Sequence, residues 1–260
     1  MGNVLRSVVI MSVATVALAQ APAAYRAPRT AYGKPDLNGV WQALNTANWN
    51  IQDHAAEAGP VATLGAAFSI PGGQGVVEGN EIPYQPWAAK KKQENAEKWL
   101  QLDPEIKCYM PGVPRATYMP YPFQIIQTPD NILMAYEFAS ATRTVRMTGQ
   151  VKSPTDSWMG WSRGRWESET LVVDVTDLND QTWFDRAGNF HSDALHLVER
   201  YTPIGPDQIN YEVTIDDPKV FTKPWKMSML LYRHREKNFQ LLEYECYAFE
   251  KEFHVVPPAR

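Results

Sequence analysis

The chain has 260 residues, a length that allows one large β domain or two small domains. Its formal net charge of −4 argues against nucleic acid and against an anionic membrane surface as main partners, because both require a basic face. The apolar fraction of 44% is ordinary for a globular protein, and the 20 prolines favour strands, turns and loops over long helices.

The first residues have the pattern of a secretion signal. Arg6 supplies a positive charge, residues 8–18 are apolar, and Ala17-Leu18-Ala19 is a small-x-small cleavage site that would leave Gln20 as the new N-terminus. A retained membrane anchor is the alternative, but the apolar run is short for a bilayer. We therefore predict a signal peptide at residues 1–19, a disordered leader at 20–34, and a periplasmic or secreted protein without a membrane span.

Export makes the two cysteines informative. Cys108 and Cys246 are the only pair that the chain offers, and an oxidising compartment would allow them to join. The bond would close a loop of roughly 140 residues, worth at most about 5 kcal/mol in the chain-entropy account. Two buried free thiols are the alternative, because a sequence does not show whether the two Cα atoms approach each other. We predict the disulfide.

The first predicted elements are few and separated by long loops. A short strand at residues 40–42 precedes residues 45–81, which have no sustained period. Residues 84–102 have partly helical spacing of apolar side chains, and we interpret the lysines at 90–92 as a solvated helix face rather than an anion patch. Residues 103–122 are rich in proline, and we expect a fixed loop across one end of a barrel.

From residue 123 onward, short runs of β-branched and aromatic residues alternate with turn residues. The predicted strands are 123–128, 132–138, 142–147, 158–166, 170–175, 194–202, 208–215, 225–233 and 239–247. Regular short strands of this kind indicate an antiparallel sandwich or barrel, and roughly eight to ten strands suffice to close a barrel. We expect one domain at residues 35–250 and a C-terminal tail at 251–260.

Several sequence blocks carry a family resemblance. They are PDLNGVW, CYMPGVPR, PFQIIQTP, WMGWSRGRWESETLVVDV, HSDALHLVERY, DDPKVFTKPW and EYEC. They are similar to blocks of a large family of exported bacterial hypothetical proteins, described as lipocalin-like and of uncharacterised function. The resemblance spans residues 35–246 and brings no catalytic residues with it. It implies a mainly β fold, an antiparallel up-and-down (lipocalin- or calycin-like) β-barrel with one N-terminal helix and long loops.

Candidate chemistry gathers in residues 158–201, which hold a predicted core strand and the polar, aromatic and acidic loop after it. His191, Asp193 and His196 have a spacing that could surround a divalent metal. On a strand, however, Asp193 and His196 face opposite sides. We therefore favour a site without a cofactor, and keep a divalent metal such as zinc at His191 and His196 as the alternative.

Glu199 alternates with the apolar Leu195 and Leu197, which places all three on one face of a strand. Inside a barrel its carboxyl group would be desolvated and its pKa raised, as an acid or base requires. The alternative is a surface glutamate or an ion pair with an arginine of a neighbouring strand, for which we name Arg165.

The loop also contains two aspartates beside an aromatic side chain. Asp180 and Asp185 flank Trp183 and are candidates for acid–base work on a substrate held against the indole ring. Ordinary turn chemistry is the alternative. Other side chains expected to line a cavity, or else to fill the core, complete the predicted ligand-binding set, which is Arg115, Tyr118, Tyr121, Trp158, Trp161, Arg165, Trp183 and Trp225.

Together these features predict an exported barrel that binds a small, apolar or amphipathic molecule in an aromatic-lined cavity. Our enzyme hypothesis is a cofactor-free isomerase, lyase, hydratase or hydrolase working by acid–base catalysis. Its predicted catalytic residues are His191 and His196 with an acidic partner among Asp180, Asp185, Asp193 and Glu199. The alternatives are a non-catalytic carrier of a hydrophobic ligand and a structural or interaction protein of the envelope. The oligomeric state stays open.

Overall fold

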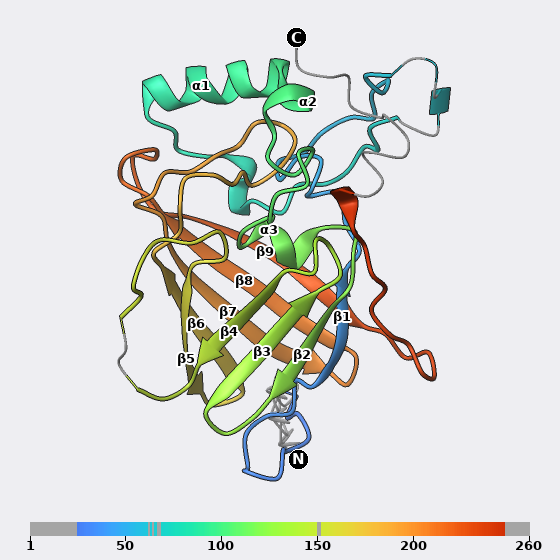
Figure 1. The fold of residues 1–260 in the computed structure, drawn as a ribbon, viewed down its shortest axis with the longest axis vertical. Helices are drawn as coiled ribbons and strands as arrows, with labels where there is room; N and C mark the ends of the chain where they lie inside the picture. The colour runs from blue at the N-terminus through green and yellow to red at the C-terminus, as the bar shows by residue number, and fades with distance from the viewer. Residues whose placement is uncertain (1–24, 62, 64, 67–68, 150–151, 248–260) are drawn as a thin grey trace, which may run out of the picture.

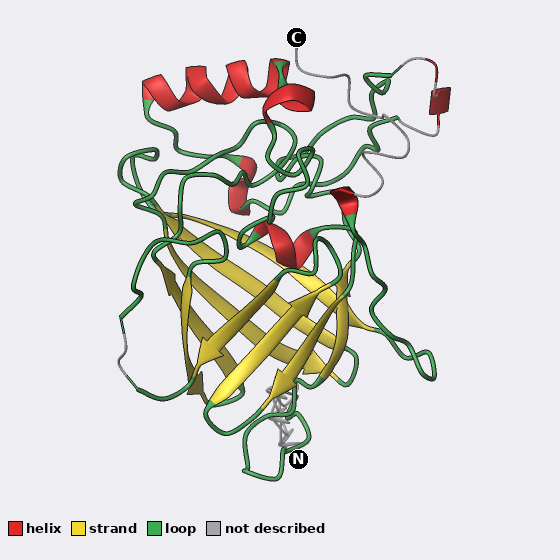
Figure 2. Cartoon of the chain, in the orientation of Figure 1, coloured by secondary structure: helices red, strands yellow, loops and turns green. Residues whose placement is uncertain are grey.

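Nine strands close into a barrel, which confirms the predicted mainly β fold of eight to ten strands (Figure 1, Figure 2). The structure is a computed structural model that describes residues 25–61, 63, 65–66, 69–149 and 152–247. The predicted signal peptide and C-terminal tail lie outside these residues. The strands are β1 (Gly39–Ala43), β2 (Phe123–Gln127), β3 (Asn131–Tyr136), β4 (Thr142–Arg146), β5 (Trp161–Glu167), β6 (Thr170–Thr176), β7 (His196–Gly205), β8 (Gln208–Asp216) and β9 (Trp225–Arg233).

The strands follow the sequence order around the barrel, and β9 pairs with β1 to close it. All neighbours are antiparallel except β4 and β5, which run parallel. Strand direction cannot alternate all the way around a closed ring of nine, so at least one junction must be parallel. A parallel junction needs a long crossover. Residues 147–160 supply that connection between β4 and β5, whereas tight turns join β5 to β6 and β7 to β8.

Buried and half-exposed side chains alternate along the strands, so one face of the sheet points into the barrel. The side chains on that face form the core. On β7, Leu197 and Tyr201 point inward, and Tyr211 and Ile215 do the same on β8. The large side chains Trp41, Phe123, Tyr136, Met134, Met227 and Leu231 are also buried in the core. The interior of this barrel is therefore largely occupied by its own side chains.

A cap of helices and loops covers one end of the barrel, and the N-terminal segment lies at the opposite end (Figure 1). The cap contains η2 (Glu78–Asn80), α1 (Pro86–Glu97), α2 (Trp99–Leu102) and α3 (Arg115–Tyr118). The helix predicted at residues 84–102 is therefore two helices, interrupted at Lys98, whose φ of −125° and ψ of 24° are not helical. All four residues of α3 are buried at the barrel mouth, where the sequence predicted a fixed loop.

The strand predicted near the C-terminal end is wrong. Residues 239–247 do not form a strand, and only Tyr244 makes a bridge, to Phe138. The closed barrel leaves β9 without a free edge, because β8 and β1 flank it on both sides. Residues 25–34, expected to belong to a disordered leader, are placed against the turn between β5 and β6, where Arg29 forms an ion pair with Glu169.

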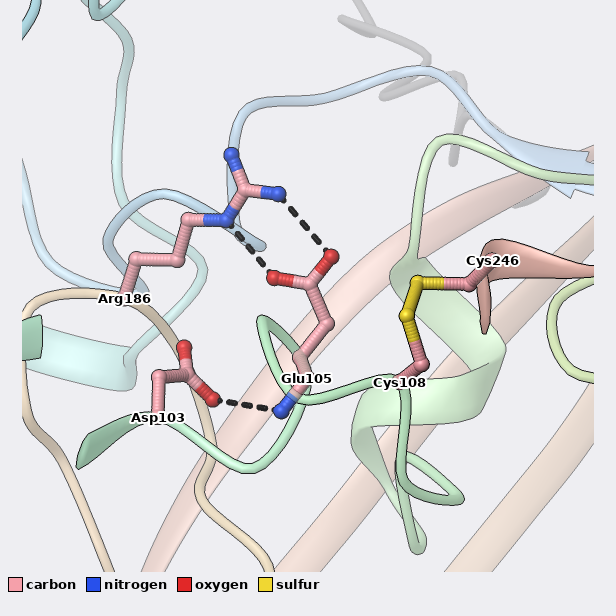
Figure 3. Close-up of a disulfide and its surroundings, with 5 residues drawn as sticks. All are labelled: Asp103, Glu105, Cys108, Arg186 and Cys246. Carbon is pink, nitrogen blue, oxygen red and sulfur yellow. Dashed lines mark hydrogen bonds and ion pairs between the residues drawn. A yellow bond between two sulfur atoms is a disulfide. The ribbon is translucent and has the colours of Figure 1, made fainter. Parts of the chain in front are cut away.

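The predicted disulfide is confirmed. Cys108 and Cys246 are bonded, with their Cα atoms 5.4 Å apart, and the bond ties the segment after β9 to the loop before α3 (Figure 3). In the part of the chain that the structure describes, no helix has the length and apolar character needed to cross a membrane.

Candidate functional site

Glu199 lies inside the barrel, on the same face as the leucines with which it alternates, and its partner is Arg143 of β4. Arg143 Nη1 and Nη2 donate to Oε2 and Oε1 over 2.6 and 3.1 Å. The hydroxyl groups of Tyr201 and Tyr211 both donate to Oε1, over 3.0 and 2.8 Å. Four donors therefore satisfy the carboxylate, and its geometry is that of a buried structural ion pair.

The expected pairing of Glu199 with Arg165 is wrong. Arg165 points away from the core on β5, and its guanidinium bonds Glu167 two residues along the same strand. Arg143 and Glu199 meet because both side chains face the barrel interior. Their wide separation in the sequence gave no indication of this contact.

His196 does not join His191. It lies on the outward face of β7, its side chain is 41% exposed, and its Nε2 is 3.1 Å from Asp174 Oδ2 on the neighbouring strand. The expectation that both histidines line one cavity is therefore wrong, and the alternative zinc site at this pair has no geometric support. No group of three or more His, Cys, Asp or Glu side chains suited to a metal ion occurs among the residues that the structure places.

The predicted residues that do come together line a cleft of about 410 Å³ between α1 and the loop from β6 to β7. We call it the α1 cleft. Its wall contains Asp180, Trp183 and His191 from the predicted set. The complete lining is Trp87, Lys91, Asn95, Leu102, Asp180, Trp183, Phe190, His191 and Ser192.

The two walls of the α1 cleft follow from local sequence. Trp87, Lys91 and Asn95 are spaced by four residues, so they lie on one face of α1. The opposite wall approaches the helix at Gly188, where φ is +84° and an added Cβ would lie 2.5 Å from Lys92 O. Glycine is required there both for the positive φ and for the close contact with the helix backbone. Trp87 meets Phe190 edge-to-face across the cleft, with the ring centroids 6.0 Å apart.

His191 contributes a neutral imidazole to the wall. Burial lowers its pKa below 6.5, which outweighs the opposite effects of the Ser192 carbonyl and of nearby aspartates. Its Nδ1 is 2.9 Å from Ser192 O, and a carbonyl oxygen only accepts, so Nδ1 carries the hydrogen. Nε2 is then an acceptor, and the buried Thr182 hydroxyl donates to it over 2.6 Å.

The other predicted acidic residues lie apart from the α1 cleft. Asp185 is completely buried beneath the loop, where the backbone N–H groups of Ile51 and Asn189 and the Asn189 amide donate to it. Burial raises the pKa of Asp185 from 3.8 to about 6, although these hydrogen bonds lower it. Asp193 is exposed, and the hydrogen bond from Lys219 lowers its pKa.

Most of the predicted ligand-binding side chains have structural contacts instead. Arg115 is buried and binds both oxygens of Asp103, over 2.8 and 2.9 Å. Tyr118 donates to the Phe184 carbonyl, and Trp225 packs edge-on against Phe184 and Phe221. Three further aromatic residues contact neighbours outside the α1 cleft, namely Tyr121 on Phe138 and Tyr244, Trp158 on Tyr109, and Trp161 beneath Arg146.

Sequence reasoning missed the helix side of the site. Lys91 belongs to the lysine run interpreted as a solvated face, yet it lines the α1 cleft. Trp87 is 56% exposed, which is unusual for a large indole ring on a charged helix. The sequence signal that could have indicated this side of the site was the apolar ring of Trp87 on the same helix face as Lys91. Nothing in the sequence showed that this face meets the loop from β6 to β7.

Comparisons with protein-family models, curated proteins and solved structures give no match to this chain.

Proposed function

We propose that the protein binds a small amphipathic molecule in the α1 cleft, with an apolar, ring-bearing body and a polar or anionic group. The observation that supports this is the composition of the cleft wall. Trp87, Trp183 and Phe190 supply aromatic surface, and Lys91 supplies an ammonium group at the same cleft. Polar side chains, Asp180 among them, share the cleft of about 410 Å³ with these rings, and polar groups placed among apolar surface are typical of a small-molecule site.

The proposed site lies in the cap, next to a closed barrel. The barrel below it is closed, and the cap is tied to the segment after β9 by the disulfide. A preformed cleft loses little conformational entropy when a ligand binds. Binding would also cover the exposed ring of Trp87, which gains free energy from removal of apolar surface from water.

Binding is testable with the fluorescent probe 1-anilinonaphthalene-8-sulfonate, which is aromatic and anionic. Lys91→Gln should weaken probe binding several-fold, because it removes the ammonium group from the cleft wall. Lys90→Gln is the matched control, since Lys90 is on the same helix but does not line the cleft. Equal affinities of the two variants would contradict the proposed role of Lys91.

A second pair of variants tests the aromatic wall. Trp87→Ala should reduce probe affinity about tenfold, whereas Leu44→Ala should not, although Leu44 is also exposed, at 68%. Incubation of wild type and Trp87→Ala with a periplasmic extract, followed by mass spectrometry of the retained molecules, would then identify the natural ligand. A ligand retained equally by both proteins would place binding elsewhere.

Acid–base catalysis is a second candidate, favoured by the neutral imidazole of His191 at the same cleft as Asp180. A substrate proton would reach Nε2 only after the Thr182 hydroxyl turns away, because that hydroxyl occupies the acceptor position. His191→Gln should then abolish turnover of the identified ligand and leave its binding measurable. Unchanged turnover in this variant would show that His191 is not the acid–base group, and no turnover by the wild type would leave a carrier as the function.

We also propose that the protein acts outside the cytoplasm. The support is the apolar run at residues 8–18 with its small-x-small site, together with a disulfide that an oxidising compartment would maintain. Cell fractionation and N-terminal sequencing should give a processed chain that begins at Gln20. An unprocessed chain in the cytoplasmic fraction would contradict export.

A further inference from the structure

Both halves of the Cys108–Cys246 bond are partly exposed to solvent. Tyr109 and Tyr247, which follow the two cysteines in the sequence, are 48% and 58% exposed. The bond therefore lies near the protein surface, and access of a thiol to the bond is what thiol–disulfide exchange requires. We call residues 103–118, which contain the first of these cysteines, the cystine segment.

The Cys108 half of the bond belongs to a tight turn that also carries Glu105. The Cys108 N–H donates to the Glu105 carbonyl over 2.9 Å. In the same turn, the Tyr109 N–H donates to the Pro104 carbonyl over 3.1 Å. The Glu105 carboxylate accepts from Arg186 Nε and Nη2 over 2.8 and 2.9 Å (Figure 3). The disulfide and an ion pair with the loop between β6 and β7 are therefore carried by one turn.

The cystine segment contacts the loop between β6 and β7 at two further points. The Tyr118 hydroxyl donates to the Phe184 carbonyl over 2.7 Å. Gly112 approaches Thr182 so closely that an added Cβ would lie 2.6 Å from the threonine hydroxyl oxygen. Together with the ion pair of Arg186, these contacts hold alternate residues of the loop.

The same part of the loop forms one wall of the α1 cleft. Trp183, which lines the cleft, lies between Thr182 and Phe184 in the sequence. The Thr182 hydroxyl donates to His191 Nε2 over 2.6 Å, and the Phe184 ring lies 5.4 Å from the His191 ring. Leu102, which comes directly before the cystine segment, also lines the cleft. A displacement of the cystine segment would therefore move residues that form the cleft wall.

The Cys246 half of the bond is held on the barrel. Tyr244, two residues earlier, forms a bridge with Phe138. Ser140 Oγ donates to the Glu245 carboxylate over 2.9 Å. Phe138 and Ser140 belong to the turn that joins β3 to β4. The disulfide is thus a cross-link between the cystine segment and the barrel, and after its reduction only noncovalent contacts hold the turn at Cys108 in place.

We propose that the Cys108–Cys246 bond positions the loop between β6 and β7 for binding in the α1 cleft, and that reduction of the bond weakens this binding. The inference rests on the function proposed above. Without the cross-link the cystine segment has a wider range of positions, so more of the cleft wall must be ordered when a ligand binds.

The reduction needs a dithiol, which supplies two electrons and two protons. One thiolate of the dithiol attacks a cystine sulfur, forms a mixed disulfide and releases the other cysteine. The second thiol of the reductant then attacks the mixed disulfide and releases the first cysteine. The products are two cysteine thiols and a reductant that now carries its own disulfide.

Titration with 1-anilinonaphthalene-8-sulfonate before and after treatment with dithiothreitol tests the proposal. The quantity compared is the difference in affinity between wild type and Lys91→Gln, because probe bound to a loosened chain elsewhere does not depend on Lys91. The difference should be several-fold in the oxidised protein, disappear after reduction and return on reoxidation. An undiminished difference after reduction overturns the inference. No difference in the oxidised protein contradicts the proposed function, and the inference falls with it.

Glu105→Gln tests the route through the cystine segment with the disulfide intact. It weakens the ion pair with Arg186 and should reduce the effect of Lys91→Gln on probe affinity in the oxidised protein. Glu167→Gln, at an exposed ion pair on β5, is the matched control and should leave that effect unchanged. A full effect of Lys91→Gln in the Glu105→Gln background would refute the proposal. Near-UV circular dichroism checks that the reduced protein is folded, and Glu105→Gln decides if it is not.

Discussion

Loss of either charge of the Arg143–Glu199 pair should destabilise the barrel, and loss of both should cost less than loss of one. Both side chains are almost completely buried. Arg143→Met leaves the Glu199 carboxylate without its cationic partner, and Glu199→Gln leaves the guanidinium without its anionic partner. The double variant buries no formal charge at this position.

The expected magnitude follows from burial and contact. Two unit charges in contact attract each other by about 4 kcal/mol at an effective dielectric constant of about 20. Breaking a buried pair by removal of one partner typically costs about 3–5 kcal/mol, because the other charge stays desolvated. Each single variant should therefore lose about 3–5 kcal/mol of unfolding free energy. In the double variant, the amide oxygen of the introduced glutamine would still accept from Tyr201 or Tyr211, so we expect a smaller loss than in either single variant.

Urea unfolding followed by tryptophan fluorescence at neutral pH measures the four proteins of this cycle. Arg165 and Glu167 provide the matched control, because their N–O distance of 2.8 Å is similar but their side chains are 55% and 41% exposed. A cycle on that surface pair should give a coupling energy below about 1 kcal/mol. A double variant at Arg143 and Glu199 that is less stable than both single variants would refute the reasoning. Probe binding in the α1 cleft should be unchanged in the double variant.

Three further predictions concern the cap and its supports. Alkylation and intact-mass analysis of the unreduced protein should find no free thiol, and Cys108→Ser and Cys246→Ser should lower the unfolding free energy equally, by at most about 5 kcal/mol. Because the folded pKa of Asp185 is raised from 3.8 to about 6, its stabilising contribution is complete below pH 3.8 and is lost as the pH rises through 6. The loss is of the order of 3 kcal/mol, so urea unfolding from pH 4 to 7 should show a downward slope that Asp185→Asn removes; parallel slopes would contradict it. Gly188→Ala should cost more stability than Gly33→Ala and should weaken probe binding in the α1 cleft. Both glycines have positive φ, but only Gly188 contacts the helix backbone. Equal stability losses of the two variants in thermal unfolding would show that the helix contact is unimportant.

The sequence by itself determined the local features of the fold. Alternation of apolar and polar residues placed most strands to within a few residues. It also put Glu199 on one strand face with Leu195 and Leu197, but left open whether this carboxylate lies inside the barrel or at the surface. The two cysteines were the only possible pair, so the expectation of an oxidising compartment favoured a disulfide over two free thiols. These features depend on the period of the strand and on composition, both of which can be seen in one segment at a time.

Closure of the barrel determined contacts between distant residues that local sequence patterns do not contain. Residues 239–247 have the composition of a strand, but the pairing of β9 with β1 leaves them no edge. Arg143 became the partner of Glu199 because β4 and β7 both direct those side chains into the same interior, although the residues are 56 positions apart. Registers and through-space partners of this kind depend on the closed ring as a whole.

The candidate site depends on tertiary structure for the same reason. Asp180, Trp183 and His191 were found from the composition of one loop, and they do line one cleft. His196 was grouped with them by its spacing, but the pleat directs it to the outer face of β7. Trp87 and Lys91 come from a helix about a hundred residues earlier, and only the packing of α1 on Gly188 brings them to that loop.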